Sequence, residues 1–237
     1  MQQKLLGHAR FAYTLATDPF LETIMDIAAA IVVANRHLAA KGLNQGASGN
    51  VSVRDGDGFR VTPSGVGADV LVPEQVVRMD MDGTWSGQWK PSSEWRFHRD
   101  IYAARPDAGA VVHCHSPAAT ALAVLGRAIP AFHYMVAIAG GVDVRCAPYA
   151  TFGTQELSDA ALAALEDRRA CLLGHHGMIA LGPTLSQAMD VAIEIEFLAD
   201  LYLRLLPLGE PPVLPAAEMA VVLEKFKGYG ANAQKRA

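Results

Sequence analysis

The chain has 237 residues, 51% of them hydrophobic, which is enough to bury the core of one α/β domain. Its formal net charge is −4 and its lysines and arginines are scattered, which argues against a nucleic-acid partner. Charged residues interrupt the longest apolar runs well before the ~20 residues of a membrane span, and residues 1–20 lack a signal-peptide pattern, so we expect no membrane segment and no secretion signal.

The first part of the chain predicts a helix, a glycine-rich loop and a hairpin. Apolar residues recur at helical spacing over residues 20–40, behind an Asp-Pro pair that is typical of a helix start. Residues 44–54 form a glycine-rich loop that leads into an alternating strand, and residues 55–58 predict a hairpin turn. The loop and the Asn50 amide could approach an anion, although two glycines in a turn usually make only a turn.

A helix is predicted from residue 91 to about residue 105, with two serines at its start. A helix N-terminus that carries two hydroxyls can bind an anion. Glu94 falls in the first turn, where the helix dipole favours a carboxylate, so it needs no catalytic role by itself. His98 lies one turn further on and could accompany Glu94, but a histidine on a helix packed against a sheet is more often structural.

Residues 110–117 combine an apolar strand with a His-x-His pair. Alternate side chains of a strand share a face, so His113 and His115 should point together while Cys114 points away. Ser116 and Pro117 then predict the N-cap and first position of the next helix. His-x-His alone is more often two hydrogen-bonded or solvent-facing histidines than a pair of metal ligands, so other residues must support a metal site.

The second half of the chain predicts a strand over residues 129–139 and a helix over residues 155–169. Another buried strand begins at residue 170 and ends in His175 and His176. Adjacent residues on a strand point to opposite faces, so at most one of these two should join His113 and His115. Residues 184–206 predict the longest helix and residues 216–227 the last one.

Strands near residues 51, 60, 111, 135 and 172, separated by hairpins and helices, predict an α/β fold. We expect a single domain with a central mixed, mostly antiparallel sheet and helices on both faces. Cys114, Cys146 and Cys171 are an odd number without a Cys-x-x-Cys pair, which favours a reducing, cytoplasmic location and a simple packing role for each thiol.

Two histidines at one strand end, a third at another and a carboxylate near a hydroxyl-rich helix start could form a zinc site that leaves a position open for substrate. The motifs also resemble, in the same order, those of the class II aldolase and adducin family, most of all its bacterial enzymes that cleave L-fuculose 1-phosphate. They are Ser-Gly-Asn-Val-Ser-Val-Arg, Thr-Pro-Ser-Gly, Pro-Ser-Ser-Glu-Trp-Arg-Phe-His, Val-Val-His-Cys-His, His-Tyr-Met, Ala-Pro-Tyr-Ala-Thr-Phe-Gly and His-Gly. The resemblance covers roughly residues 22–230, so we expect an N-terminal extension over residues 1–21 and a catalytic domain over residues 22–237.

The resemblance implies a zinc-dependent aldolase, other divalent metals being possible. Its reaction would reversibly cleave a ketose 1-phosphate of the L-fuculose 1-phosphate type to dihydroxyacetone phosphate and a short aldehyde such as lactaldehyde. The implied ligands are His113, His115 and His176, the last chosen over His175 because the family's ligand directly precedes a glycine. Glu94 matches the acid/base carboxylate that also approaches the metal.

The resemblance also assigns residues to the two ends of the substrate. The residues that match the phosphate pocket are Asn50, Ser64, Gly65, Ser92 and Ser93. Tyr134 matches the phenol that handles a proton at the aldehyde oxygen, and Phe152, Phe226 and Tyr229 match residues near the aldehyde part. Family members resemble homotetramers with sites at subunit interfaces, so Tyr134 and the C-terminal tail could act on a neighbouring subunit's metal.

Small departures from the family pattern leave the aldehyde open. Ser64 replaces a threonine, Ala47 and Ser48 alter the glycine loop, and His175 stands where the fuculose enzymes lack histidine. The alternatives are cleavage of 5-deoxyribulose 1-phosphate or of its 5-methylthio analogue, and an epimerase or dehydratase acting on a pentulose phosphate. A non-enzymatic, adducin-like module is disfavoured because the ligand set is complete.

Overall fold

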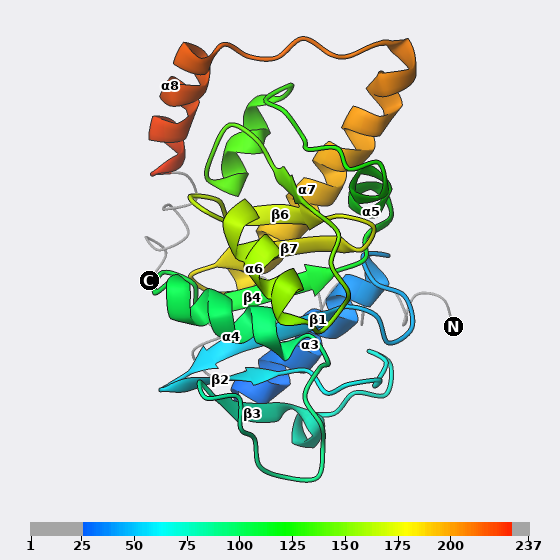
Figure 1. Cartoon of the computed structure of the whole chain (residues 1–237), viewed down its shortest axis with the longest axis vertical. Coiled ribbons are helices and arrows are strands. Elements are labelled where there is room, and N and C mark those ends of the chain that lie inside the picture. The colour runs from blue at the N-terminus through cyan, green and yellow to red at the C-terminus, as the bar shows by residue number, and fades with distance from the viewer. Residues whose placement is uncertain (1–25, 229–237) are drawn as a thin grey trace, which may run out of the picture.

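A computed structural model of the chain describes residues 26–228, and Figure 1 shows the arrangement of its elements. The expected extension over residues 1–21, the expected helix start before residue 26, and Tyr229 all lie outside the described residues. The helices are α3 (Ile27–Ala40), α4 (Trp95–Ala104), α5 (Pro117–Val124), α6 (Gln155–Ala164), α7 (Leu185–Leu205) and α8 (Ala216–Phe226). Short 3-10 helices are η1 (Pro73–Gln75), η2 (Tyr134–Ala139) and η3 (Leu206–Leu208).

The strands are β1 (Asn50–Asp55), β2 (Gly58–Val61), β3 (Val77–Asp80), β4 (Ala110–Cys114), β5 (Arg145–Ala147), β6 (Ala170–Leu173) and β7 (Gly177–Gly182). They form a seven-stranded sheet in the order β3-β2-β1-β4-β7-β6-β5. Every neighbouring pair is antiparallel except β5 and β6, which are parallel. This confirms the prediction of a mixed, mostly antiparallel sheet.

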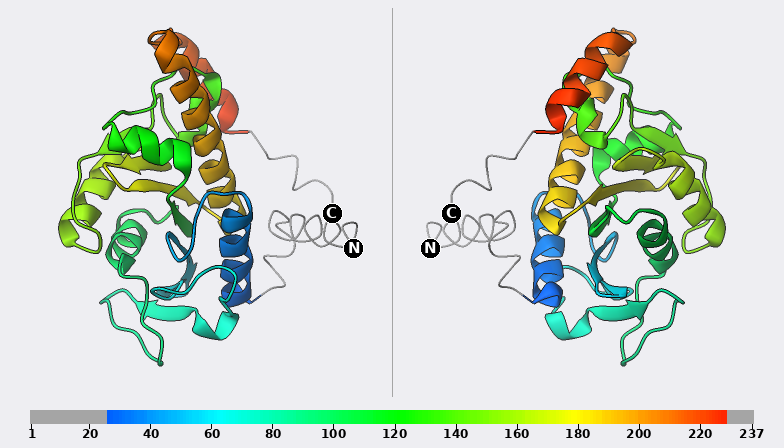
Figure 2. Two further views of the ribbon diagram at one scale, coloured as in Figure 1. Left: turned by 90° about the vertical axis from the view of Figure 1, so that its right-hand side faces the viewer. Right: turned by 90° about the vertical axis from the view of Figure 1, so that its left-hand side faces the viewer.

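Helices cover both faces of the sheet, as predicted, and Figure 2 shows α3 and α7 on the face opposite α4 and α6. The alternation of β4 explains the two cores. Val112 and Cys114 pack with residues of α3, α5 and α7, whereas Val111 packs with residues of α4 and α6. Both cores rest on the same sheet, so the fold is a single domain. Within residues 26–228, no helix is long and apolar enough to cross a membrane.

The strand predicted over residues 129–139 is wrong. Ile129 makes an isolated bridge to Val144, and the chain then turns into η2. The His133 side chain accepts a hydrogen bond from the Met135 N–H at the start of η2, and Gly140 ends it in a left-handed conformation. A short apolar run cannot distinguish a buried strand from a buried helical turn, and here the local capping groups decide.

The helix predicted from residue 91 begins later, at Trp95. Residues 91–93 instead lie against the turn at residues 62–65, because Pro63 and Pro91 form a bridge and the Ser92 N–H donates to the Thr62 carbonyl at 3.0 Å. Glu94 is therefore the N-cap of α4 and not a residue of its first turn. The residues before it thus lie beside the turn that contains Ser64, which brings together Ser64 and the serines that the resemblance assigns to the phosphate pocket.

The start of α5 is held by a carboxylate from another helix. Ser116 is the N-cap, as predicted, but its side chain makes no capping hydrogen bond. Glu196 on α7 accepts instead from the N–H groups of Ala118, at 2.8 Å, and Ala119, at 2.9 Å. Because α5 follows His115 almost directly, this contact also fixes the end of β4.

We predict that Glu196→Ala lowers the free energy of unfolding by at least about 2 kcal/mol, because it leaves two buried N–H groups without an acceptor. Glu196→Gln keeps one acceptor oxygen and should lose roughly half as much. Urea unfolding measures both, and Glu224→Ala is the matched control because that carboxylate is 71% exposed. Equal stability of Glu196→Ala and the control would contradict the capping role.

Candidate active site

Three imidazoles converge at the end of β4. His113 and His115 bring their Nε2 atoms to 3.0 Å, and the three rings of His113, His115 and His176 have centroids 4.8–4.9 Å apart. Cys114 points into the opposite core, as strand alternation requires. The ligand atoms of the three histidines all lie within 4.8 Å of one another, so together they could hold one metal ion.

The geometry around this group fits a tetrahedral ion. His113 Nδ1 lies 2.9 Å from the Met178 carbonyl, which only accepts, so Nδ1 carries the proton and Nε2 presents a lone pair. Ligands at zinc bond lengths lie about 3.3 Å apart. Glu94 Oε2 lies 3.2 Å from His113 Nε2, and Glu94 Oε1 lies 3.3 Å from His176 Nε2. Oε1 is buried and accepts no hydrogen bond, which also fits a nearby cation.

Burial keeps the outer imidazoles neutral. It lowers the pKa values of His115 and His176 to about 4, and a proton on His113 would act in the same direction. Burial alone would raise the pKa of Glu94, but positive charge on His113 or His176 and the hydrogen bond from the Asn50 amide outweigh burial and hold that pKa below its usual range. The site therefore offers neutral nitrogen donors at His115 and His176 beside an ionised carboxylate at pH 7.

Tight backbone packing positions His115. Its N–H donates to Asn44 Oδ1 at 2.9 Å. Gly49 has a φ of +73°, and a Cβ at this position would overlap the Asn44 side chain. A Cβ at Gly177 would lie 2.5 Å from the Cys114 carbonyl and 3.0 Å from His115 Cδ2. Glycine at both positions is thus a condition for this placement of the ring.

His175 and His176 lie in the turn between β6 and β7, and not on a strand as the sequence suggested. His175 adopts a left-handed conformation with a φ of 56°. This turn, rather than strand alternation, sends the two rings apart. His176 joins the group of histidines that could hold a metal. His175 lines the pocket, and its ring packs edge to face against Tyr149 with centroids 5.9 Å apart.

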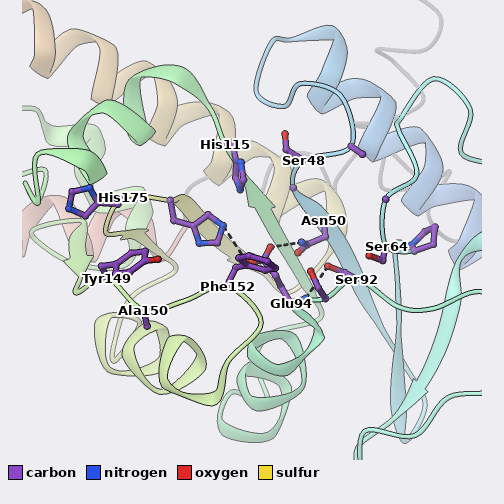
Figure 3. Close-up of a pocket in the computed structure, with 16 residues that line it drawn as sticks. Ser48, Asn50, Ser64, Ser92, Glu94, His115, Tyr149, Ala150, Phe152 and His175 are labelled. Atoms are coloured by element: carbon purple, nitrogen blue, oxygen red, sulfur yellow. Dashed lines mark hydrogen bonds and ion pairs between the residues drawn. The ribbon is translucent and has the colours of Figure 1, made fainter.

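A cavity of about 340 Å³ opens beside the histidines. Figure 3 shows Ser64 and Ser92 on one side of Glu94, and Tyr149 and His175 on the other. All the residues assigned to phosphate binding, namely Asn50, Ser64, Gly65, Ser92 and Ser93, line this cavity. None of the described residues that line the cavity is a lysine or an arginine, so its anion donors are hydroxyls, amides and backbone N–H groups.

Of the described residues assigned to the aldehyde side, one lines the cavity and two do not. Phe152 lines the cavity next to Tyr149 and Ala150, and Arg96 holds this loop by donating to the Gly153 carbonyl at 2.8 Å. Tyr134 is 50% exposed on η2 and does not line the cavity. Phe226 on α8 packs beside the cluster of Ala131, Ala137 and Met219, away from the histidines.

Sequence reasoning assigned no role to Ser52 and Tyr102, and treated His98 as structural. In the structure, His98 is hydrogen-bonded to Asn50, Ser52 to His98 and Tyr102 to Ser52, so the three form one chain within the core that ends at Asn50. The available signal was weak: two polar side chains, Asn50 and Ser52, alternate on a strand that is otherwise apolar where it enters the sheet. Their partners lie 46 to 50 residues away in the sequence, so spacing could not reveal them.

Comparison with known proteins identifies the family. Residues 29–203 match the family described as Class II Aldolase and Adducin N-terminal domain. The chain is 60% identical over 204 residues to 5-methylthioribulose-1-phosphate/5-deoxyribulose-1-phosphate aldolase of Rhodospirillum rubrum, covering 86% of this chain and 92% of that protein. It is 53% identical over 190 residues to L-fuculose phosphate aldolase of Escherichia coli K12, covering 80% of this chain and 88% of that protein.

Comparison with solved structures points to the same family. A solved structure of L-fuculose 1-phosphate aldolase superposes with a TM-score of 0.83 at 40% identity, covering 85% of this chain and 96% of the other. The family match covers all seven strands of the sheet and the three histidines. This chain therefore belongs to the class II aldolase and adducin family, and it is an enzyme of the aldolase branch.

Proposed function

We propose that this enzyme cleaves a ketose 1-phosphate, with the help of a divalent metal ion, to dihydroxyacetone phosphate and a short aldehyde with an apolar end. The observation that carries the proposal is the order of groups along the cavity. Ser64 and Ser92 on one side suit a phosphate, Glu94 lies in the middle, and Tyr149 on the other side suits an apolar group, with Phe152 also lining the cavity. A ketose 1-phosphate has its phosphate, its reacting carbons and its tail in the same order.

Zinc is the metal we infer, because three neutral imidazoles with an open position are typical of catalytic zinc sites. His113, His115 and His176 would hold the ion, with Glu94 close enough to approach it. A bound divalent ion would supply Lewis-acid stabilisation of the negative charge that develops next to the broken bond, worth several kcal/mol. Neutral donors leave the ion its full charge for this task.

Glu94 moves the proton at the carbon that becomes the hydroxymethyl group of dihydroxyacetone phosphate. In the synthetic direction its carboxylate takes a proton from that carbon, and the electron pair forms an enediolate that attacks the aldehyde carbon. The phenol of Tyr134 gives a proton to the aldehyde oxygen as the new carbon–carbon bond forms. Cleavage runs the same transfers backwards, and solvent exchange restores both groups.

Remote binding of the phosphate would hold the reacting carbons in place. Asn50, Ser64, Gly65, Ser92 and Ser93 form this part of the proposal. Two features support them: the turn at residues 62–65 lies against residues 90–93, and the start of α4 adds a helix dipole that favours anions. Neutral hydrogen-bond donors are sufficient to bind the phosphate here, because the phosphate only anchors the substrate and takes no part in bond cleavage.

Assembly completes the proposal. Tyr134 is half-exposed and lies outside the cavity, and Phe226 is also distant. We infer a homotetramer in which Tyr134, Phe226 and Tyr229 reach the aldehyde side of a neighbouring subunit's site, while Phe152 serves its own. A cytoplasmic location is part of the same proposal, supported by the three cysteines, which are all free.

Three candidate substrates differ in the group at the aldehyde end. Similarity favours 5-deoxyribulose 1-phosphate and its 5-methylthio analogue, since the relative named for them is more similar than the one named for L-fuculose phosphate. Tyr149, Ala150 and Phe152 would also suit a methyl or methylthio group. L-fuculose 1-phosphate, which the sequence motifs favoured, remains the third candidate.

A substrate panel scored by release of dihydroxyacetone phosphate tests the function. We expect the zinc-loaded enzyme to cleave all three compounds, with higher kcat/KM for the two that carry no hydroxyl beyond the carbon that becomes the aldehyde. Removal of the metal should abolish release, and added Zn²⁺ should restore it. Full activity in metal-free protein would contradict the proposal, and product formation without dihydroxyacetone phosphate would indicate an epimerase or dehydratase.

Glu94→Gln tests the proton transfer. We expect the metal content to stay at the wild-type level while the turnover number falls by roughly 10²- to 10⁴-fold, because an amide cannot exchange the proton. Glu74→Gln is the matched control, since Glu74 is exposed and distant from the cavity. An unchanged turnover number in Glu94→Gln would remove this carboxylate from the mechanism.

A further inference from the structure

A line of buried polar side chains runs from the core to Glu94. Asn50 and Ser52 share one face of β1, and His98 and Tyr102 lie one turn apart on α4, which packs on that face. Tyr102 OH lies 2.8 Å from Ser52 Oγ, and Ser52 Oγ lies 2.7 Å from His98 Nδ1. His98 Nε2 lies 2.5 Å from Asn50 Oδ1, and Asn50 Nδ2 donates to Glu94 Oε2 at 3.0 Å.

The charge of Glu94 fixes the direction of every hydrogen bond in this line. An ionised carboxylate only accepts, so Asn50 must turn its NH₂ group toward Glu94 and its Oδ1 toward His98. His98 must then carry its proton on Nε2, which leaves Nδ1 to accept from the Ser52 hydroxyl. Ser52 in turn accepts from the Tyr102 phenol. Each donor therefore points toward the active site.

This direction requires a neutral imidazole and a neutral phenol. Burial lowers the pKa of His98 to about 3, and it raises the pKa of the Tyr102 phenol above its usual value. His98 and Ser52 are both 0% exposed, so no solvent can replace a missing partner. The line is fully satisfied only in this arrangement.

We propose that His98 is a positioning residue, which holds the Asn50 amide in the orientation that donates to Glu94 and thereby sets the carboxylate against the reacting carbon. Rotation of the amide by half a turn would place Oδ1 against Glu94 Oε2, two acceptors at hydrogen-bonding distance. The N–H of His98 prevents this rotation because it needs an acceptor at Oδ1. The inference rests on the proposed function, since it concerns the proton transfer by Glu94.

The inference differs from two simpler interpretations of the same residues. A structural histidine would stabilise the packing of α4 on β1 without affecting turnover specifically. A phosphate-binding Asn50 would affect substrate affinity, and one of its two amide hydrogens is still available for that contact. Positioning of Glu94 instead predicts a loss in kcat with little change in KM or in inhibition by inorganic phosphate.

His98→Phe removes both nitrogens and keeps an aromatic ring at this position. In the wild-type structure the His98 ring packs on Phe97 with centroids 4.6 Å apart. At saturating zinc and with metal content verified, we expect kcat to fall about 10- to 100-fold, the range for residues that orient a catalytic group. KM and the inhibition constant of inorganic phosphate should change less than about twofold. His98→Gln can donate to Asn50 Oδ1 again and should recover most of the lost kcat.

Ser52→Ala and Ser158→Ala form a matched pair. Each removes a hydroxyl that is 0% exposed, but Ser52 donates to His98 whereas Ser158 donates to Asp100 at 2.6 Å, outside the line to Glu94. We expect Ser52→Ala to lower kcat and Ser158→Ala to leave it unchanged. If His98→Phe fails to fold, this pair and His98→Gln decide the question.

A double-mutant cycle tests whether His98 acts through Asn50. The double variant His98→Phe/Asn50→Ala should lose no more kcat than the more impaired single variant. Additive losses, an unchanged kcat in His98→Phe, or equal losses in Ser52→Ala and Ser158→Ala would each overturn the inference. An inactive wild-type enzyme would overturn the proposed function instead, so the two failures are distinguishable.

Discussion

The register of three antiparallel strands decides where the functional groups lie. Asn50 of β1 lies opposite His113 of β4, and His113 lies opposite Ile179 of β7. Met178, next to it, provides the carbonyl that fixes the His113 tautomer. A slip of β4 by one residue would send His113 into the core now occupied by Cys114 and bring Cys114 to the cavity. The sheet therefore selects both the residue of β4 that joins the histidine group and the nitrogen on which it is protonated.

The polar groups around Glu94 satisfy one another in a region from which water is largely excluded. A buried carboxylate is costly unless hydrogen bonds or charges offset the loss of hydration. Here the Asn50 amide donates a hydrogen bond to Glu94, and a bound cation beside His113 and His176 would add to it. The same contacts tie β1, β4 and α4 together, so metal binding should be coupled to the stability of this part of the fold.

Local patterns in the sequence were sufficient for some parts of this structure. Strand alternation alone placed His113 and His115 together and Cys114 in the core. Family resemblance was needed to choose His176 over His175, because their separation depends on a turn with a positive φ that no apolar pattern reveals. The apolar composition of residues 129–139 predicts a strand equally well as the buried helical turn that the structure has there. The line from Tyr102 to Asn50 depends on register and on the packing of α4, which only the three-dimensional arrangement shows.

The most direct test of the proposed chemistry is hydrogen exchange in dihydroxyacetone phosphate without any aldehyde. Formation of an enediolate requires Glu94 to remove one hydrogen from the hydroxymethyl carbon. Zinc-loaded enzyme in D₂O should therefore exchange one of the two hydrogens at that carbon and none at the phosphorylated carbon, as followed by NMR. Enzyme that cleaves its ketose phosphate yet exchanges neither hydrogen, or exchanges hydrogen equally well without metal, would contradict the assignment of Glu94 and the metal centre to this step.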